Sequence, residues 1–305
     1  MMQLKMLIPG VGLLFLASCY TGSSDSLRDP ISQEGISATV QANLPYGATK
    51  AHVVASFYKD GKKQPLVGGD VIVASSDSGS VFLKSLENLS GNYFANLALS
   101  DPGAGINFSI EYDPLEAQDD RWYPMDEVLV DAGPGELVGY TTAVAFPDPL
   151  MLTEPAGNEV YTDRNQEITL SWAVSPTTEQ IRLTTVQTCF SGDRSMQWGL
   201  SSIVDPDVPG THSVSVGSLV PSTNFVNVVS DFVDQLSVIV VGAILDAYSF
   251  GLIDAKDIPI ESFELEYCTI SLTVFREISN ELGAGISGGY AIGSTSDTVT
   301  VIYQP

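Results

Sequence analysis

The sequence predicts an all-β protein built from two β-sandwich domains. Runs of β-branched and aromatic residues recur at about 8 to 12 residue intervals with turn residues between them, a spacing typical of sandwiches and barrels. Within such runs apolar side chains recur at every second position, as at Tyr93, Ala95, Leu97 and Leu99, which indicates one buried face. The chain has 305 residues, enough for two domains of ordinary size.

The first 18 residues have the features of a secretory signal. Lys5 precedes an apolar run from Met6 to Phe15, and small residues follow it. Leu16-Ala17-Ser18-Cys19 resembles a bacterial lipobox, in which the cysteine is lipidated and becomes the first residue of the mature chain. We therefore expect a lipoprotein signal peptide at 1–18 and a lipidated Cys19. An ordinary signal peptide or an uncleaved membrane helix are the alternatives, although the run is shorter than the roughly 20 residues that span a bilayer.

A polar segment, residues 19–35, follows the lipobox and is expected to be a flexible tether. Tyr20 stands where an aspartate resembles a signal for retention in the inner membrane. The resemblance therefore implies an outer-membrane lipoprotein, on the periplasmic face or at the cell surface.

The N-terminal β-sandwich is expected over residues 36–147. Turn residues such as Asp60-Gly61, Ser78-Gly79 and Ser90-Gly91 separate its strands. The expected strands are Ala51–Tyr58, Asp70–Ala74, Val81–Leu86, Tyr93–Leu99 and Ile106–Tyr112.

The C-terminal sandwich is expected over residues 148–305. The two prolines in Phe146-Pro147-Asp148-Pro149 favour an extended connection and mark the boundary. The expected strands are Leu150–Thr153, Glu167–Ala173, Gln180–Thr188, His212–Val216, Phe263–Phe275 and Thr298–Tyr303.

An insertion at 222–250 interrupts the second strand series. Between residues 224 and 248 apolar side chains recur every three or four positions, which predicts a helix. We therefore expect a helical insertion in the second sandwich, and the β-branched residues of Val238–Val241 leave a strand as the alternative.

Several short stretches resemble uncharacterised two-domain bacterial lipoproteins. The second half is also similar to immunoglobulin-like and fibronectin type III sandwiches, in which a tryptophan on an early strand fills the core. The resemblance implies an immunoglobulin-like fold and an envelope location, with no catalytic residues to carry over. It is carried by Leu66-Val67-Gly68-Gly69-Asp70, Gly91-Asn92-Tyr93, Leu152-Thr153-Glu154-Pro155, Ile168-Thr169-Leu170-Ser171-Trp172 and the run from Cys268 to Arg276.

The chain contains three cysteines. If a lipid occupies Cys19, then Cys189 and Cys268 remain as a pair. Disulfides persist in the compartments that exported proteins reach, so we expect these two residues to form a disulfide. Two buried free thiols are the alternative.

The charge of the chain excludes some partners. Its 13 basic and 37 acidic residues give a net charge of −24, and such a surface repels nucleic acid. The two histidines, His52 and His212, have no ligand at metal-binding spacing, so neither a metal nor a cofactor is expected. The acidic segment from Asp113 to Glu127 leaves calcium as a weakly supported ligand, and Trp122 and Tyr123 within it could stack on a sugar ring.

Two glycine motifs match catalytic or nucleotide-binding patterns without their structural context. Gly283-Ala284-Gly285-Ile286-Ser287-Gly288 fits G-x-G-x-x-G, and Gly285 to Gly289 fits G-x-S-x-G. Both patterns need a helix directly after the motif, whereas a turn and a strand are expected here. We therefore expect a glycine loop between two strands.

These observations favour a lipid-anchored, non-catalytic protein of the cell envelope with a structural or partner-binding role. The expected partners are the membrane, through the N-terminal lipid, and an envelope protein. A carbohydrate-binding surface module is the alternative function, followed by an envelope hydrolase.

Overall fold

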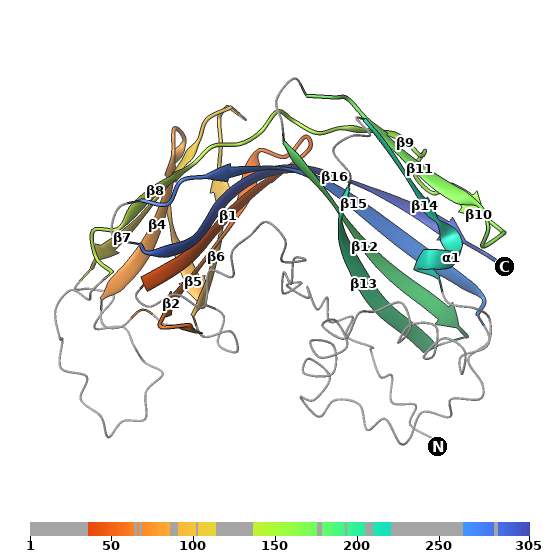
Figure 1. Ribbon diagram of the computed structural model, residues 1–305, viewed down its shortest axis with the longest axis horizontal. Coiled ribbons are helices and arrows are strands. Elements are labelled where there is room, and N and C mark those ends of the chain that lie inside the picture. Colours follow the sequence, from red (N-terminus) through yellow and green to blue (C-terminus); the bar gives the residue numbers. More distant parts are fainter. Residues whose placement is uncertain are drawn as a thin grey trace, which may run out of the picture.

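The structure, a computed structural model, is an arch of two lobes built almost entirely from β-strands (Figure 1). Among the residues that it describes, the only helix is the single turn α1 (Val216–Leu219). The described residues are 36–63, 66, 69–85, 91–101, 103–113, 137–175, 179–192, 194–204, 210–220, 265–283 and 286–305. The insertion expected at 222–250, the signal peptide and the tether lie outside them.

The first lobe contains eight strands that enclose one hydrophobic core. Alternate residues of the longer strands point into it, for example Ala38, Val40, Ala42 and Leu44 of the first strand, which are all buried. The strands are β1 (Ile36–Pro45), β2 (Lys50–Lys59), β3 (Lys62–Lys63), β4 (Asp70–Ser76), β5 (Gly79–Ser85), β6 (Asn92–Ala98), β7 (Ile106–Tyr112) and β8 (Thr141–Val144).

The second lobe is a sandwich around a separate core. Its smaller sheet has the strand order β14-β11-β9, and Ile168, Leu170 and Trp172 of β11 pack against the larger sheet. The strands are β9 (Leu152–Glu154), β10 (Val160–Tyr161), β11 (Glu167–Trp172), β12 (Gln180–Ser191), β13 (Arg194–Val204), β14 (Thr211–Ser215), β15 (Tyr267–Asn280) and β16 (Gly288–Tyr303).

One large sheet runs through both lobes, with the strand order β13-β12-β15-β16-β1-β2-β6-β5-β4-β7-β8. The link is β16, which pairs antiparallel with β15 from Ala291 to Tyr303 and parallel with β1 from Gly288 to Ser296. Ala291 belongs to the first core, whereas Val301 and Tyr303 belong to the second. The lobes are therefore joined by continuous backbone hydrogen bonding.

The two hydrophobic cores do not correspond to two consecutive stretches of the chain that meet between residues 147 and 148, as the sequence predicts. The chain does pass from one core to the other there, since Phe146 packs on the first core and Leu150 lies in the second. It passes between them again within β16. Leu282 and Ile286, just before β16, also pack on the first core, so the C-terminal segment completes both lobes.

Two glycines allow β16 to lie close to its neighbours. Gly289 has a φ of +112°, and a Cβ there would overlap the carbonyl oxygen of Ala38. A Cβ on Gly293 would overlap the carbonyl oxygen of Ala145. Only a residue without a side chain fits where backbone approaches backbone in this way.

The all-β class is confirmed, and each expected strand overlaps a strand of the structure, although Leu150 lies before β9 and Val216 begins α1. The turns at Asp60-Gly61, Gly79 and Gly91 have the positive φ values that glycine and aspartate tolerate. The features that were not expected are the strands β1, β3, β8, β10 and β13, the single helical turn α1, and the extension of the last strand back to Gly288.

Candidate functional site

The large sheet has one face turned away from both hydrophobic cores, which we call the inner face. In β16 the odd-numbered residues Ala291, Val299, Val301 and Tyr303 are buried in the cores. The even-numbered residues therefore point to the opposite face along the whole strand. Figure 1 shows β9, β11 and β14 on the outer side of the arch and β12, β13 and β15 on its inner side.

In the second lobe the inner face contains a grid of hydroxyl side chains, with Arg182, Val186, Phe275 and Ile302 beside it. Ser201, Thr184, Thr273 and Thr298 stand directly opposite one another on four adjacent strands. The Oγ1 atoms of Thr273 and Thr298 are 2.8 Å apart, and Thr184 Oγ1 lies 3.3 Å from Ser201 Oγ. In the next row Ser271 Oγ is 3.1 Å from Thr300 Oγ1.

These hydroxyl pairs hold one another in place without exhausting their hydrogen-bonding capacity. A hydroxyl has one donor and two acceptor lone pairs, so a pair that shares one hydrogen bond keeps a donor and several acceptors for a ligand. The grid is therefore an ordered array of polar groups.

In the first lobe the inner face carries amides, hydroxyls and aromatic rings. Gln41 Nε2 donates to the hydroxyl of Tyr290 (3.1 Å), and Ser294 Oγ donates to Asn43 Oδ1 (3.0 Å). Ser56 Oγ donates to Asn92 Oδ1 (2.7 Å). These contacts join β1, β16, β2 and β6 on one surface.

We define the inner face by the outward residues of its central strands. Of these, the only acidic residue is Glu277, which is paired with Arg182, although the whole chain has a net charge of −24. The residues are Arg182, Thr184, Val186, Thr188 and Phe190 of β12; Tyr267, Thr269, Ser271, Thr273, Phe275 and Glu277 of β15; Tyr290, Ile292, Ser294, Ser296, Thr298, Thr300 and Ile302 of β16; Thr39, Gln41 and Asn43 of β1; His52, Val54, Ser56 and Tyr58 of β2; and Asn92, Phe94 and Asn96 of β6.

A buried ion pair holds the junction between the lobes. Arg276 Nε lies 3.0 Å from Glu179 Oε2, and the two side chains are only 3% and 5% exposed. The guanidinium also donates to the carbonyl oxygens of Asp148, Pro149 and Ala173. Because Arg276 lies on β15, it fastens the connection between the lobes to the large sheet.

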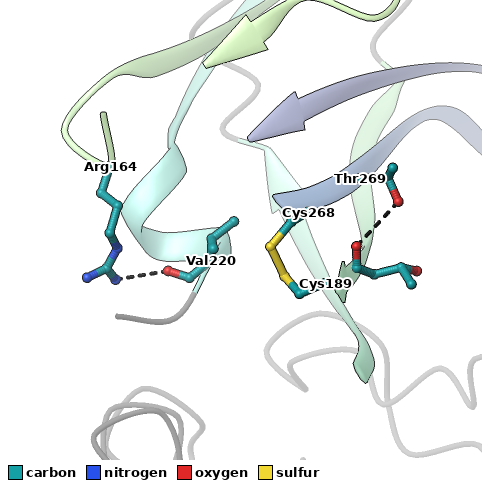
Figure 2. Close-up of a disulfide and its surroundings, with 6 residues drawn as sticks. Arg164, Cys189, Val220, Cys268 and Thr269 are labelled. Atoms are coloured by element: carbon teal, nitrogen blue, oxygen red, sulfur yellow. Dashed lines mark hydrogen bonds between the residues drawn. A yellow bond between two sulfur atoms is a disulfide. The ribbon is translucent and has the colours of Figure 1, made fainter. Parts of the chain in front are cut away.

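The predicted disulfide is confirmed. Cys189 of β12 and Cys268 of β15 are opposite one another in register, with their Cα atoms 4.0 Å apart, and both are fully buried in the second core. Figure 2 shows the bond beside Thr269, which donates to the carbonyl oxygen of Thr188 (3.4 Å). On the other side Arg164 holds the end of α1 by donating to the carbonyl oxygen of Val220 (2.9 Å). Cys19 lies outside the described residues.

The glycine motifs extend from the β15–β16 connection into the start of β16, and Ala284 and Gly285 lie outside the described residues. The segment connects β15 to β16, and β16 begins at Gly288. Ser287, the serine of the G-x-S-x-G pattern, donates its hydroxyl to the carbonyl oxygen of Ile36 (2.8 Å). This serine therefore fastens the loop to the start of β1.

The two histidines lie in different lobes. His52 is exposed on β2 and hydrogen-bonded to Asn96, while His212 lies on β14 opposite Leu170. Burial lowers the pKa of His212 below its ordinary value, so its imidazole is neutral at pH 7. Within the described part of the chain, no three His, Cys, Asp or Glu side chains are grouped so that they could hold a metal ion. Asp113 is described, whereas Glu116 to Glu127, including Trp122 and Tyr123, are not.

A shallow depression of about 460 Å³ lies where the β9–β10 connection meets β16. Its carboxylate, Asp297, accepts hydrogen bonds from the backbone N–H groups of Leu152 (2.9 Å) and Thr298 (2.8 Å). The backbone N–H of Asn158 donates to the carbonyl oxygen of Thr300 (2.7 Å). These polar groups fasten the connection to the sheet, and the depression offers no paired acid and base.

The inner face could not be identified from the sequence, although part of its signal is visible. Hydroxyl residues alternate with core residues from Thr269 to Val274 and from Thr298 to Val301. This alternation shows that each strand has a polar face. The alternation does not show that β12, β15 and β16 are neighbours in the sheet. The grid forms because these three strands pair with one another.

The described residues contain no helix that is long and apolar enough to cross a membrane.

Comparisons with known proteins give no family for this chain. No family model and no curated protein match it. Among solved structures it is similar to the FN1-FN3 domains of chicken CNTN1, with 10% identity and a TM-score of 0.19 over 89% of this chain, which spans 65% of the length of that one. It is also similar to CBD12 from CALX1.2, with 5% identity and a TM-score of 0.19 over 88% of this chain and all of that one. At these TM-scores neither likeness carries an argument.

Proposed function

We propose that this chain is a lipid-anchored, non-catalytic protein of the bacterial cell envelope that binds its partner through the inner face. Lipid on Cys19 holds the protein at the outer membrane, and the tether of residues 19–35 carries the two lobes away from it. The binding role is supported by the polar side chains that the inner face carries in both lobes.

The cysteines are the observation that carries the envelope location. The chain has three, and two of them form the buried disulfide. A buried disulfide is typical of exported proteins. The third cysteine, Cys19, stands at the end of the signal sequence, in the position that a lipobox cysteine takes. Several acyl chains on one protein give stable attachment to a bilayer.

The non-catalytic part of the proposal is supported by the bonding of the polar groups in the described residues. Asp297 accepts hydrogen bonds from backbone N–H groups, and Ser287 donates one to a backbone carbonyl oxygen. Glu277 forms an ion pair with Arg182. Each of these groups has a structural partner. The inner face instead offers many neutral hydrogen-bonding groups, which suits recognition of a surface.

Cys19→Ala is expected to release the protein from membranes or to leave it unprocessed, because the variant has no thiol to accept lipid. The measurement is fractionation of cells, followed by salt-washed membrane pelleting and immunoblotting. Ser24→Ala, a substitution in the tether, is the matched control and should fractionate like the wild type. A Cys19→Ala protein that is processed and pellets with membranes like the wild type would show that the anchor is not at this residue.

A further inference from the structure

We propose that the inner face binds an uncharged polysaccharide strand along β16 and its neighbours. This inference deepens the proposed binding role and rests on it, because it names the chemical class of the partner. Its first support is the length of the face. β16 has 16 residues, and at about 3.3 Å per residue such a strand is roughly 50 Å long. An extended polymer can reach the exposed side chains on both sides of Ser294 and Ser296, which are themselves buried in the middle of the strand.

The charge of the face selects an uncharged ligand. The protein has a net charge of −24, which repels anionic polymers. A cationic ligand would need carboxylates, and the only one among the inner-face residues is Glu277, which Arg182 already neutralises. The inner face can therefore recognise its ligand mainly through the neutral hydrogen-bonding groups of its side chains.

The side chains of the face match a polyhydroxylated ligand. Hydroxyls and amides both donate and accept, as the hydroxyls of a sugar do. The pairs Thr273–Thr298 and Ser271–Thr300 are already ordered by their mutual hydrogen bonds, so binding orders few new groups, which favours affinity. A protein partner would favour an apolar interface core. The central row Ser201, Thr184, Thr273 and Thr298 is polar, and the apolar Val186 and Phe275 lie in the rows on either side of it.

An aromatic platform lies at one end of the grid. Tyr267 and Phe190 stand opposite one another on β15 and β12, with ring centroids 4.6 Å apart and planes 17° from parallel. Tyr267 is 37% exposed. A ring held by a stacked neighbour presents a fixed apolar surface beside a polar tip, on which the C–H face of a sugar ring can lie.

The test is affinity electrophoresis of the full mature chain, kept in a detergent without a sugar headgroup, through gels that contain glucomannan, hydroxyethylcellulose or dextran. Alginate serves as the anionic control polymer. We expect at least one of the three neutral polymers to retard the protein and alginate to leave its mobility unchanged. Retardation by none of the three neutral polymers would overturn the proposal. Retardation by alginate alone would contradict the charge argument and overturn it as well.

Two variants place the binding on the inner face. Thr273→Glu puts a charge in the middle of the hydroxyl grid and should weaken retardation by about tenfold or more, since an unpaired charge under a ligand costs more than one lost hydrogen bond. Its matched control is Thr169→Glu on β11, because Thr169 is an exposed threonine whose Oγ1 also lies 3.1 Å from a serine hydroxyl, that of Ser213, but on the opposite side of the same lobe. Thr169→Glu should be retarded like the wild type. Equal loss in both variants would overturn the assignment to the inner face.

Tyr267→Ala tests the platform separately and should weaken retardation by up to about tenfold, because an aromatic stacking contact contributes up to about 1.5 kcal/mol. Circular dichroism of each variant shows whether it folds, and unchanged retardation in a folded Thr273→Glu protein contradicts the proposal. Failure here leaves the membrane fractionation of Cys19→Ala unaffected, so the two proposals fail separately.

Discussion

Arg276→Met is expected to destabilise the protein by about 3–5 kcal/mol, the usual cost of breaking a buried ion pair by removing one partner. The substitution leaves the Glu179 carboxylate buried and unpaired. It also removes the donors to the carbonyl oxygens of Asp148, Pro149 and Ala173. For a protein of this size the midpoint of thermal unfolding should fall by about 10 °C.

Two further variants distinguish the loss of stability caused by breaking the ion pair from any loss caused by removing a positive charge in general. Lys84→Met, on the exposed surface of β5, should change the free energy of unfolding by less than about 0.5 kcal/mol. Adding Glu179→Gln to Arg276→Met removes the unpaired charge and should recover part of the loss. If Arg276→Met changes the free energy of unfolding by less than about 1 kcal/mol, the junction does not depend on this pair.

Replacing both Cys189 and Cys268 by alanine should lower the free energy of unfolding by about 2–5 kcal/mol. The cysteines are 79 residues apart in the sequence, and a cross-link over a loop of this length removes much of the conformational freedom of the unfolded chain. Urea unfolding of wild type and variant under non-reducing conditions measures the difference.

Reductant provides the control for the disulfide. It should lower the stability of the wild type toward that of the double variant and leave the variant unchanged. Peptide mapping without reduction should find the two cysteine peptides joined. Two alkylatable thiols in the native protein, or equal stability of the two proteins, would contradict the bond.

The strands that the sequence predicts correctly are those with strong local alternation. From Cys268 to Val274 every second residue is buried, and the residues between them are polar. The turns at Asp60-Gly61 and Gly91 use residues with a known preference for positive φ. Both signals depend on neighbouring positions in the chain, so one sequence contains them.

The features that were missed depend on contacts between distant segments. The first half of β16 contains Gly288, Gly289 and Gly293 and the polar run Ser294 to Asp297, so it shows no apolar alternation. It becomes a strand because it pairs with β1, which precedes it by about 250 residues. Tertiary context of this kind regularly overrides local preference.

The sequence contains one indication of the buried ion pair. Arg276 continues the buried alternation of Ile270, Leu272 and Val274, so its position indicates a buried cation that needs a partner. The partner, Glu179, lies about a hundred residues away in the chain and is placed by the pairing of β12 with β15. The inner face follows from the same pairing, which explains why a strand-by-strand reading does not reveal it.

The mass of the protein's own N-terminus tests the proposed lipid anchor at Cys19. The native protein is purified from membranes and its first peptide is analysed by mass spectrometry. We expect a chain that begins at Cys19 and carries a diacylglyceryl group on the sulfur. A chain that keeps residues 1–18, begins after residue 19, or begins at an unmodified Cys19 would contradict it.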